Sequence, residues 1–224
     1  MPSAPTVIVF DVNETLSDLA PMADRFTDVG APATSAGTWF ASVLRDGFAL
    51  TAAGGQEKFA VIAGAVLRTM LTGLPLDRDL DAAVEHVMKG FTALPVHPDV
   101  PDGVRALRAA GYRLVTLSNG GAGVAQSLLE RAGLLDEFEA LLSVEDAGAW
   151  KPARSAYEHA AQSCGVPVQE LLLVAVHPWD LDGAARAGMS AAWIDRSGSP
   201  YPGFFAPPTW TVRSLEELPA ALRG

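Results

Sequence analysis

Several polar residues in this chain stand after strand-like apolar runs. The first of them along the chain is a carboxylate. The run "VIVF" leads into Asp11, and Thr15 lies four residues further on. Ser118 and Asn119 end the run "YRLVTL", and Lys151 follows "SVEDAGAW". An aspartate can attack an electrophile to form an ester or an acyl phosphate, and a nearby ammonium group keeps that carboxylate ionised. These residue types therefore suit covalent catalysis.

A second carboxylate lies in the same kind of position. His177 and Asp180 follow the run "LLLVAV", and a second carboxylate can orient or deprotonate the water that hydrolyses a covalent intermediate. Each residue also has a structural interpretation when taken alone. Asp11 and Asp180 could be helix N-caps, "SNGG" a turn, and Lys151 a solvated surface charge. Their joint placement after apolar runs is what favours chemistry.

The elements that must position these residues alternate between strands and helices. Apolar runs typical of strands recur, with amphipathic stretches between them that end at a glycine. Runs that are apolar on both faces indicate a parallel sheet covered on both sides, which binds ligands outside the carboxyl ends of its strands. We therefore expect an α/β fold with a Rossmann-like parallel sheet core and helices on both faces. Strands are predicted near 6–11, 112–118, 140–144, 171–176 and 190–195, and helices near 101–111, 123–133, 155–165 and 180–188.

A long insert separates the first predicted strand from the second. Residues 17–94 contain three stretches with helical amphipathic spacing, and they predict an inserted α-helical cap domain over the strand ends. Residues 94–103 would be the return hinge, and 1–16 together with 95–224 would form the α/β catalytic core domain. The Pro- and Gly-rich stretch 195–210 is expected to be an ordered surface loop.

Composition and charge narrow the classes of partner. The 224 residues carry a formal net charge of −10, which argues against nucleic acids and anionic membranes because both bind basic faces. Cys164 is the only cysteine, which excludes an intrachain disulfide and a cysteine-based metal site. The first residues lack the features of a secretory signal, and no apolar run has the length of a membrane span, so we expect a cytoplasmic protein. The apolar content of the cap would suit a homodimer as well as a closed monomer.

Four motifs resemble the haloacid dehalogenase superfamily in order and spacing: "FDVNETL", "TLSNG", "WKP" before "SAYEHA", and "VAVHPWDLDGAARAGM". With the inserted cap, the resemblance covers nearly the whole chain. Most members are Mg²⁺-dependent phosphatases with an aspartate at the position of Asn13 and Gly-Asp-Ser in the fourth motif, where this chain has Ala-Val-His. An asparagine amide cannot act as a general acid, and Val176 offers no side-chain oxygen to magnesium. The two replacements favour chemistry without a metal or other cofactor.

The 2-haloacid dehalogenases (type II) are the branch that this chain resembles best. The resemblance implies hydrolysis of short 2-haloalkanoic acids to 2-hydroxy acids. Asp11 would attack the halogen-bearing carbon and displace halide, and a water near Asp180 would hydrolyse the ester. Ser118 and Lys151 would hold the substrate carboxylate. The positions that match the pattern are Asp11, Thr15, Ser118, Asn119, Lys151, Tyr157, Trp179 and Asp180.

The remaining matched positions have supporting roles in this branch. By the same resemblance, Asn119 would help to receive the leaving halide. Thr15 and Tyr157 would orient the nucleophile and the lysine, and Trp179 would belong to the residues that bind substrate or halide.

Several positions depart from the pattern of the branch. Asn13 stands where a tyrosine is usual, and Phe40 follows Trp39 where an arginine that contacts the halide is usual. Arg45, about one helical turn further on, could supply the missing guanidinium or could pair with Asp46. Trp39 and Phe40 are expected to shape the substrate pocket.

His177 replaces the usual asparagine, beside Ala175 in place of a serine. Its imidazole could donate a hydrogen bond to the substrate carboxylate or to a small halide, or help to activate water, and its charge would titrate near neutral pH. We interpret it as a binding residue rather than a packing residue.

Two other functions stay open from the sequence. A Mg²⁺-dependent phosphatase or phosphonate hydrolase that tolerates Asn13 would turn over a phosphate ester when magnesium is added. A non-catalytic ligand-binding protein on the same scaffold would be stabilised by its ligand without turnover. The last is least favoured, because Asp11, Lys151 and Asp180 all remain.

Overall fold

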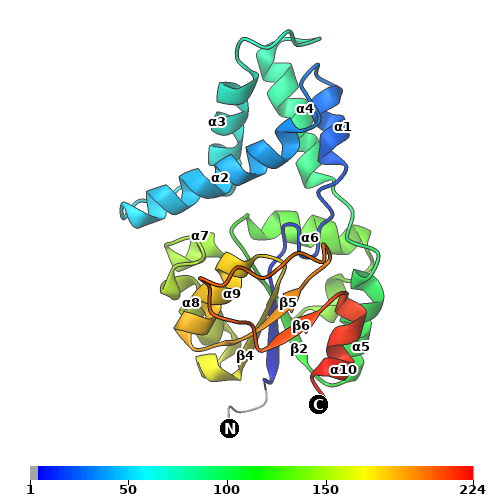
Figure 1. Ribbon diagram of the computed structural model, residues 1–224, viewed down its shortest axis with the longest axis vertical. Coiled ribbons are helices and arrows are strands. Elements are labelled where there is room, and N and C mark those ends of the chain that lie inside the picture. The colour runs from blue at the N-terminus through cyan, green and yellow to red at the C-terminus, as the bar shows by residue number, and fades with distance from the viewer. Residues whose placement is uncertain (1–4, 224) are drawn as a thin grey trace.

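A parallel sheet lies inside the lower part of the molecule in the computed structural model, which describes residues 5–223 (Figure 1). The strand order is β3-β2-β1-β4-β5-β6, and every neighbouring pair is parallel. Because β1 is central, its carboxyl end lies between those of β2 and β4, which places Asp11 in the middle of that edge. The strands are β1 (Val7–Phe10), β2 (Arg113–Ser118), β3 (Ala140–Ser143), β4 (Leu171–Ala175), β5 (Ser190–Ile194) and β6 (Trp210–Val212).

Alternate side chains of the strands pack on opposite faces of the sheet, as the two-residue period of a strand requires. Val7 and Val9 join an apolar cluster with α8 and α9, whereas Ile8 and Phe10 join a second cluster with α5, α6 and α10. Both faces are therefore buried, and the predicted α/β fold class is confirmed. The helices on this sheet are α5 (Val100–Ala109), α6 (Ala122–Arg131), α8 (Arg154–Cys164), α9 (Pro178–Ala187) and α10 (Leu218–Ala221), and the short α7 (Val144–Ala147) follows β3.

Four helices form a separate layer above the carboxyl ends of the strands (Figure 1). Their apolar sides meet around Trp39, which is fully buried, lies edge-on to Phe91 at 5.4 Å and donates through Nε1 to the carbonyl of Ala63 at 3.1 Å. Ser17 forms an isolated β-bridge with Val96, so the two chain segments that lead into and out of this layer run side by side. The helices are α1 (Met22–Thr27), α2 (Ser35–Ala52), α3 (Phe59–Leu71) and α4 (Leu80–Thr92).

The observed elements lie within a few residues of the predicted ones, and the structure adds the strand β6 and the short helices α1, α7 and α10. The strand β6 was not expected, because three residues after a Pro- and Gly-rich loop carry too little periodicity to indicate a strand. Its pairing with β5 comes from tertiary structure, and the N–H of Asp195 donates to the carbonyl of Val212 at 2.8 Å. Within residues 5–223, no helix combines the length and the apolar content needed to cross a bilayer.

Candidate active site

Lys151 lies at the centre of the site, fully buried between two carboxylates. Its Nζ donates to Oδ1 of Asp11 at 2.8 Å and to Oδ2 of Asp180 at 2.6 Å. Asp11 is 4% exposed and Asp180 is 0% exposed. Buried charges are tolerated when they are paired and hydrogen-bonded. The three residues that sequence reasoning placed together are thus in direct contact.

The turn after β1 holds the second oxygen of Asp11. Oγ1 of Thr15 donates to Oδ2 of Asp11 at 2.7 Å and accepts the N–H of Val176, which follows β4, at 3.1 Å. The N–H of Leu16 closes the turn on the carbonyl of Val12 at 2.9 Å. Thr15 therefore joins the nucleophile candidate to the neighbouring strand end, as its predicted orienting role requires.

Asp180 is fixed by the first turn of α9. Pro178 takes a position at the start of this helix, where its missing N–H costs nothing, and the helix N-terminus favours a negative charge. The hydroxyl of Tyr157 donates to Oδ1 of Asp180 at 2.6 Å and also approaches its carbonyl at 3.0 Å. Gly183 permits this approach, because a Cβ there would lie 2.6 Å from the Tyr157 oxygen. Tyr157 thus contacts Asp180, and it acts on Lys151 only through that carboxylate.

The charges of this group follow from burial and pairing. Burial raises the pKa of Asp11, but the Lys151 ammonium and then His177 outweigh it, so the net pKa lies below the usual 3.8. Burial raises the pKa of Asp180 above the same value, although Lys151 opposes the shift. Burial lowers the pKa of Lys151, but the two carboxylates outweigh it and hold the pKa above 10.5. At neutral pH the ammonium group faces an ionised Asp11, as a nucleophile requires.

Two polar residues, Ser118 and Asn119, follow one another at the carboxyl end of β2. Oδ1 of Asn119 accepts the backbone N–H of Lys151 at 2.9 Å, and its Nδ2 approaches the carbonyl of the same residue at 3.5 Å. Oγ of Ser118 accepts the N–H of Gly120 at 2.9 Å, which leaves its own hydrogen able to donate. Asn119 therefore positions the lysine through its backbone, a contact that was not expected from the sequence.

His177 lies beside the nucleophile and links the sheet to the helical layer. Its Nε2 is 3.2 Å from the carbonyl oxygen of Asn13 and 3.7 Å from Oδ2 of Asp11. Its ring stacks between Phe40 of α2, at a centroid distance of 6.4 Å, and Trp179 of α9, at 5.1 Å. The predicted binding residues Asn13, Phe40 and Trp179 are thus gathered around His177.

Two predicted residues lie outside this group. The side chain of Arg45 is 69% exposed and its Nε donates to Oδ1 of Asp46 at 2.8 Å. Of the two roles considered for Arg45, the pairing with its neighbour is the one observed. Trp39 packs into the interior of the helical layer, where it stabilises that layer instead of facing the carboxylates.

A cavity of about 540 Å³ opens between α1 and α2, and we call it the cap cavity. Its size falls within the range of small-molecule sites. Its wall is mostly apolar, with Met22, Leu44 and Phe40 among its residues, and its polar residues are Glu14 and His177. Asp11 does not line the cap cavity, but His177, which does, lies 3.7 Å from Oδ2 of Asp11.

Glu14 was missed by sequence reasoning. It stands inside the first motif, next to Asn13 and Thr15, but nothing in its type or spacing marks it as part of the site. In the structure its backbone has φ = +62°, which is unusual for a residue other than glycine. Its Oε2 lies 3.5 Å from Nε2 of His177. Only the conformation of the turn reveals this contact.

The side-chain oxygens around Asp11 and Asp180 are not arranged as a magnesium site. Among the residues that the structure describes, no three His, Cys, Asp or Glu side chains are arranged to hold a metal ion. The two carboxylates that could contribute oxygens, Asp11 and Asp180, both contact the Lys151 ammonium, and Val176 carries no side-chain oxygen.

The chain is similar to known hydrolases over most of its length. A family model for haloacid dehalogenase-like hydrolases matches residues 5–188. An (S)-2-haloacid dehalogenase of Pseudomonas sp. (strain YL) is 34% identical over 144 residues, which span 64% of this chain and 62% of that protein, less than two thirds of its length. An (S)-2-haloacid dehalogenase of Pseudomonas putida is 29% identical over 213 residues, 94% of this chain and 93% of that protein. The structure of an L-2-haloacid dehalogenase of Xanthobacter autotrophicus with covalently bound chloropropionic acid matches with a TM-score of 0.87 and 25% identity, and covers 98% of this chain and 99% of that one.

Proposed function

The chain belongs to the haloacid dehalogenase-like hydrolases, and from this premise we propose that it hydrolyses short 2-haloalkanoic acids to 2-hydroxy acids through an ester of Asp11. The observation that carries the proposal is the buried, ionised Asp11 carboxylate held between the ammonium of Lys151 and the hydroxyl of Thr15. A relative of the same fold, from Xanthobacter autotrophicus, is described with chloropropionic acid covalently bound. This supports a covalent step in the reaction.

In the first half of the reaction, a carboxylate oxygen of Asp11 attacks C2 of the substrate. The new C–O bond forms as the carbon–halogen bond breaks, and the halide leaves with the bonding electron pair. Lys151 and Thr15 fix the orientation of the carboxylate, because one contacts each oxygen. The attack needs no proton transfer, which agrees with an asparagine at position 13 in place of a general acid.

In the second half, water attacks the carbonyl carbon of the Asp11 ester. The ester C–O bond breaks, the product leaves as a 2-hydroxy acid, and the water oxygen stays in the side chain of Asp11. Asp180 orients this water or receives its proton, and a proton of the water ends on the oxygen of the leaving group, which becomes the hydroxyl of the product. The raised pKa of Asp180 suits a group that accepts a proton. Tyr157 holds Asp180 in place for this step.

In this proposal Ser118, Lys151 and His177 bind the substrate carboxylate, and Asn119 helps to receive the halide. The hydrogen of the Ser118 hydroxyl and the second hydrogen of the Asn119 amide remain able to donate. The apolar wall of the cap cavity accommodates the alkyl group of the acid.

The experiment that tests the proposal measures free halide and free phosphate from one set of reactions, with and without Mg²⁺. We expect halide from 2-chloropropionate or a haloacetate in the presence of EDTA, and loss of that activity in Asp11→Asn. The matched control is Asp81→Asn, which removes an exposed carboxylate (78% exposed side chain) and should leave the rate unchanged. Magnesium-dependent release of phosphate from a generic ester, without halide release, would establish the phosphatase alternative instead. Binding without turnover would establish the non-catalytic one.

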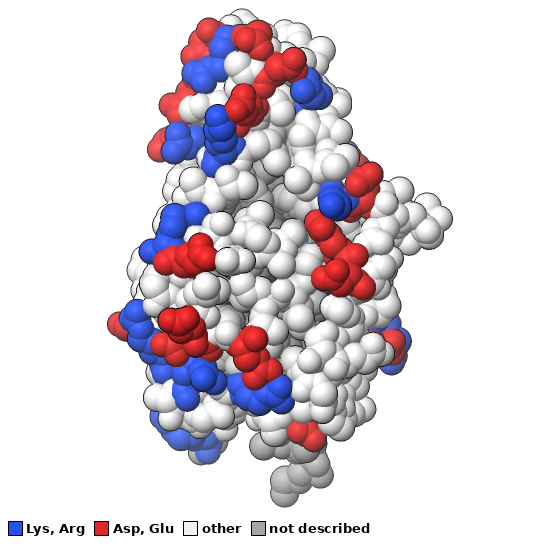
Figure 2. Space-filling model, turned by 180° about the vertical axis from the view of Figure 1, so that it is seen from behind, with Lys and Arg blue, Asp and Glu red and all other residues white. Residues whose placement is uncertain are grey.

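We further propose the division of the chain into a cap domain of residues 17–94 and a core domain of 1–16 and 95–224. The packing of α1–α4 around Trp39 supports this division. A cytoplasmic enzyme that acts on a small molecule, without a nucleic-acid or membrane partner, fits the net charge of −10. On the face in Figure 2, Lys and Arg side chains stand beside Asp and Glu and do not gather into a basic surface. A homodimer is part of the proposal, and sedimentation equilibrium tests it.

A further inference from the structure

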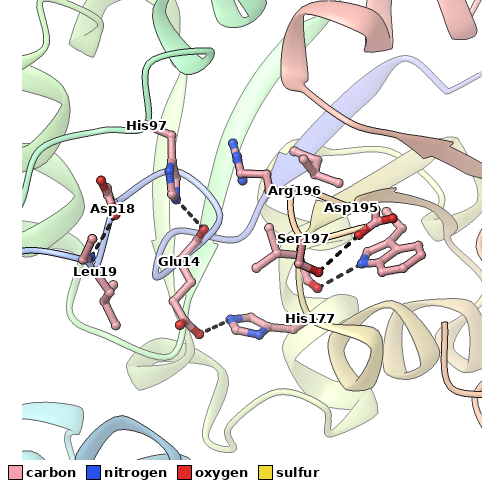
Figure 3. Close-up of a pocket in the computed structure, with 12 residues that line it drawn as sticks. Glu14, Asp18, Leu19, His97, His177, Asp195, Arg196 and Ser197 are labelled. Atoms are coloured by element: carbon pink, nitrogen blue, oxygen red, sulfur yellow. Dashed lines mark hydrogen bonds and ion pairs between the residues drawn. The ribbon is translucent and has the colours of Figure 1, made fainter. Parts of the chain in front are cut away.

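Glu14 and His177 stand between Asp11 and two cavities. Both residues line the cap cavity, and both line a second cavity of about 300 Å³ beside the end of β5, which we call the outer cavity. Figure 3 shows the outer cavity with Glu14 between His97 and His177. Asp11 itself is 4% exposed and lines neither cavity. The Glu14–His177 pair therefore borders both cavities, and His177 lies 3.7 Å from Oδ2 of Asp11.

The site needs a cation for a carboxylate substrate. Lys151 is shared by Asp11 and Asp180, so these three buried groups already carry a net charge of −1. A substrate anion adds a second negative charge, and burying it unpaired is costly. Arg45 points into solvent. Among the residues that the structure describes, the basic side chains within 4 Å of the Asp11 carboxylate are Lys151 and His177, which leaves His177 for a second anion.

The geometry of His177 suits a carboxylate on the carbon next to the reacting one. Its Nε2 faces a carbonyl oxygen of Asn13 at 3.2 Å, and because a carbonyl oxygen only accepts, this nitrogen carries a hydrogen. The same Nε2 is 3.7 Å from Oδ2 of Asp11. Two bonded carbons are about 1.5 Å apart, so a donor this close to the nucleophile reaches a charge on C1 when C2 is under attack. Phe40 and Trp179 hold the ring in this orientation.

The Glu14 carboxylate lies within ion-pair distance of the same nitrogen in the structure. Its Oε2 lies 3.5 Å from Nε2 of His177. Its backbone is held because its carbonyl accepts from Nε2 of His97 at 2.9 Å, whereas its side chain is 41% exposed and has room to turn outward. Burial, only partly offset by His177 and reinforced by Asp11, raises the pKa of Glu14, so its charge is poorly stabilised where it lies.

We propose that Glu14 is an internal counter-ion that takes the place of the substrate carboxylate on His177, and that a 2-halocarboxylate binds by exchanging with it. Glu14 is then a specificity-determining residue. It lowers the affinity for every carboxylate ligand by competing for His177, and it has no such effect on a neutral ligand of the same shape. The inference rests on the proposed function for the identity of the substrate, but not for the anion site itself.

The test is the binding of propionate, which cannot react, measured by titration calorimetry and compared with neutral propionamide. We expect Glu14→Gln to bind propionate at least about fivefold more tightly than the wild type, with propionamide unchanged within about twofold. Glu14→Gly is a second variant that removes the carboxylate and also suits the positive φ at this position. Glu216→Gln, an exposed position, changes the net charge equally and should leave both affinities unchanged.

A double variant shows whether the tighter binding of propionate in Glu14→Gln depends on His177. In Glu14→Gln combined with His177→Asn, the improved binding of propionate should be lost. Equal affinity of wild type and Glu14→Gln for propionate, an equal gain for propionamide, or no binding of propionate to any variant would overturn the proposal. Failure of the proposed function looks different: no halide is released from any 2-haloacid, while Glu14→Gln still binds propionate more tightly.

Discussion

Replacing Lys151 with methionine tests the electrostatics of the site directly. The Lys151 ammonium separates two carboxylates with 0% and 4% exposure, and both contact the same Nζ, at 2.6 and 2.8 Å. Their oxygens are therefore no further apart than the sum of these distances. Methionine fills much of the same volume without the charge. The change leaves two negative charges side by side in the interior.

Breaking a buried ion pair by removing one partner typically costs about 3–5 kcal/mol in the free energy of unfolding. For a chain of this size that corresponds to a fall of roughly 6–20 °C in the melting temperature. One of the two carboxylates should escape the repulsion by taking up a proton, so its pKa in the folded variant rises above the unfolded value. An acid whose pKa is raised by folding contributes stability below its unfolded pKa, and that contribution is lost as the pH rises through the folded pKa.

The assay is urea unfolding of Lys151→Met and of the wild type at pH 7 and pH 5. We expect the gap between the two proteins to be largest at pH 7 and to narrow at pH 5. The matched control is Lys89→Met, which removes a lysine that is 75% exposed and pairs with Glu85 along one helix, and which should cost less than about 0.5 kcal/mol. A loss below about 1 kcal/mol in Lys151→Met, or a gap that does not change with pH, would refute the reasoning.

Three further predictions follow from contacts at or near the site. Tyr157→Phe removes a hydrogen bond to the Asp180 carboxylate (2.6 Å) and should lower the free energy of unfolding by about 1.5–3 kcal/mol, measured by urea titration; no loss would show that the bond is not formed. Arg45→Ala should leave kcat/KM for a 2-haloacid within about twofold of the wild type, because that side chain is 69% exposed and pairs with its neighbour; a large fall would place the guanidinium at the halide. Because Lys151 and His177 outweigh burial and keep the pKa of Asp11 below 3.8, the rate of halide release in a single turnover at saturating enzyme should be unchanged within about twofold between pH 7 and pH 5. A decline that follows one protonation in this range would contradict the lowered pKa of Asp11.

The sequence predicted the sheet and the position of the chemistry because both depend on local pattern. Strands buried on both faces produce continuous apolar runs, and polar residues that follow such runs must meet at one edge of a parallel sheet. The contacts of Asp11 with Thr15 and of Lys151 with Asp180 follow from this placement together with the motifs. These predictions required no knowledge of side-chain packing.

The remaining features of the site depend on how the helical layer sits on the sheet. The sequence could not decide between two roles for Arg45, because the choice depends on the rotation of α2 about its axis, and this rotation turns Phe40 toward His177 and Arg45 into solvent. The contact of Glu14 with His177 depends on a left-handed backbone conformation at Glu14, which could not be predicted from the residue type. Tertiary contacts determine both the rotation of α2 and the backbone conformation of Glu14.

The origin of the oxygen in the product tests the central claim most directly. In a single turnover in H₂¹⁸O with enzyme in excess over a 2-haloacid, the account predicts that the first 2-hydroxy acid carries unlabelled oxygen from the enzyme and that the label appears in the side chain of Asp11. A product that carries the heavy oxygen from the first turnover, with Asp11 unlabelled, would contradict it.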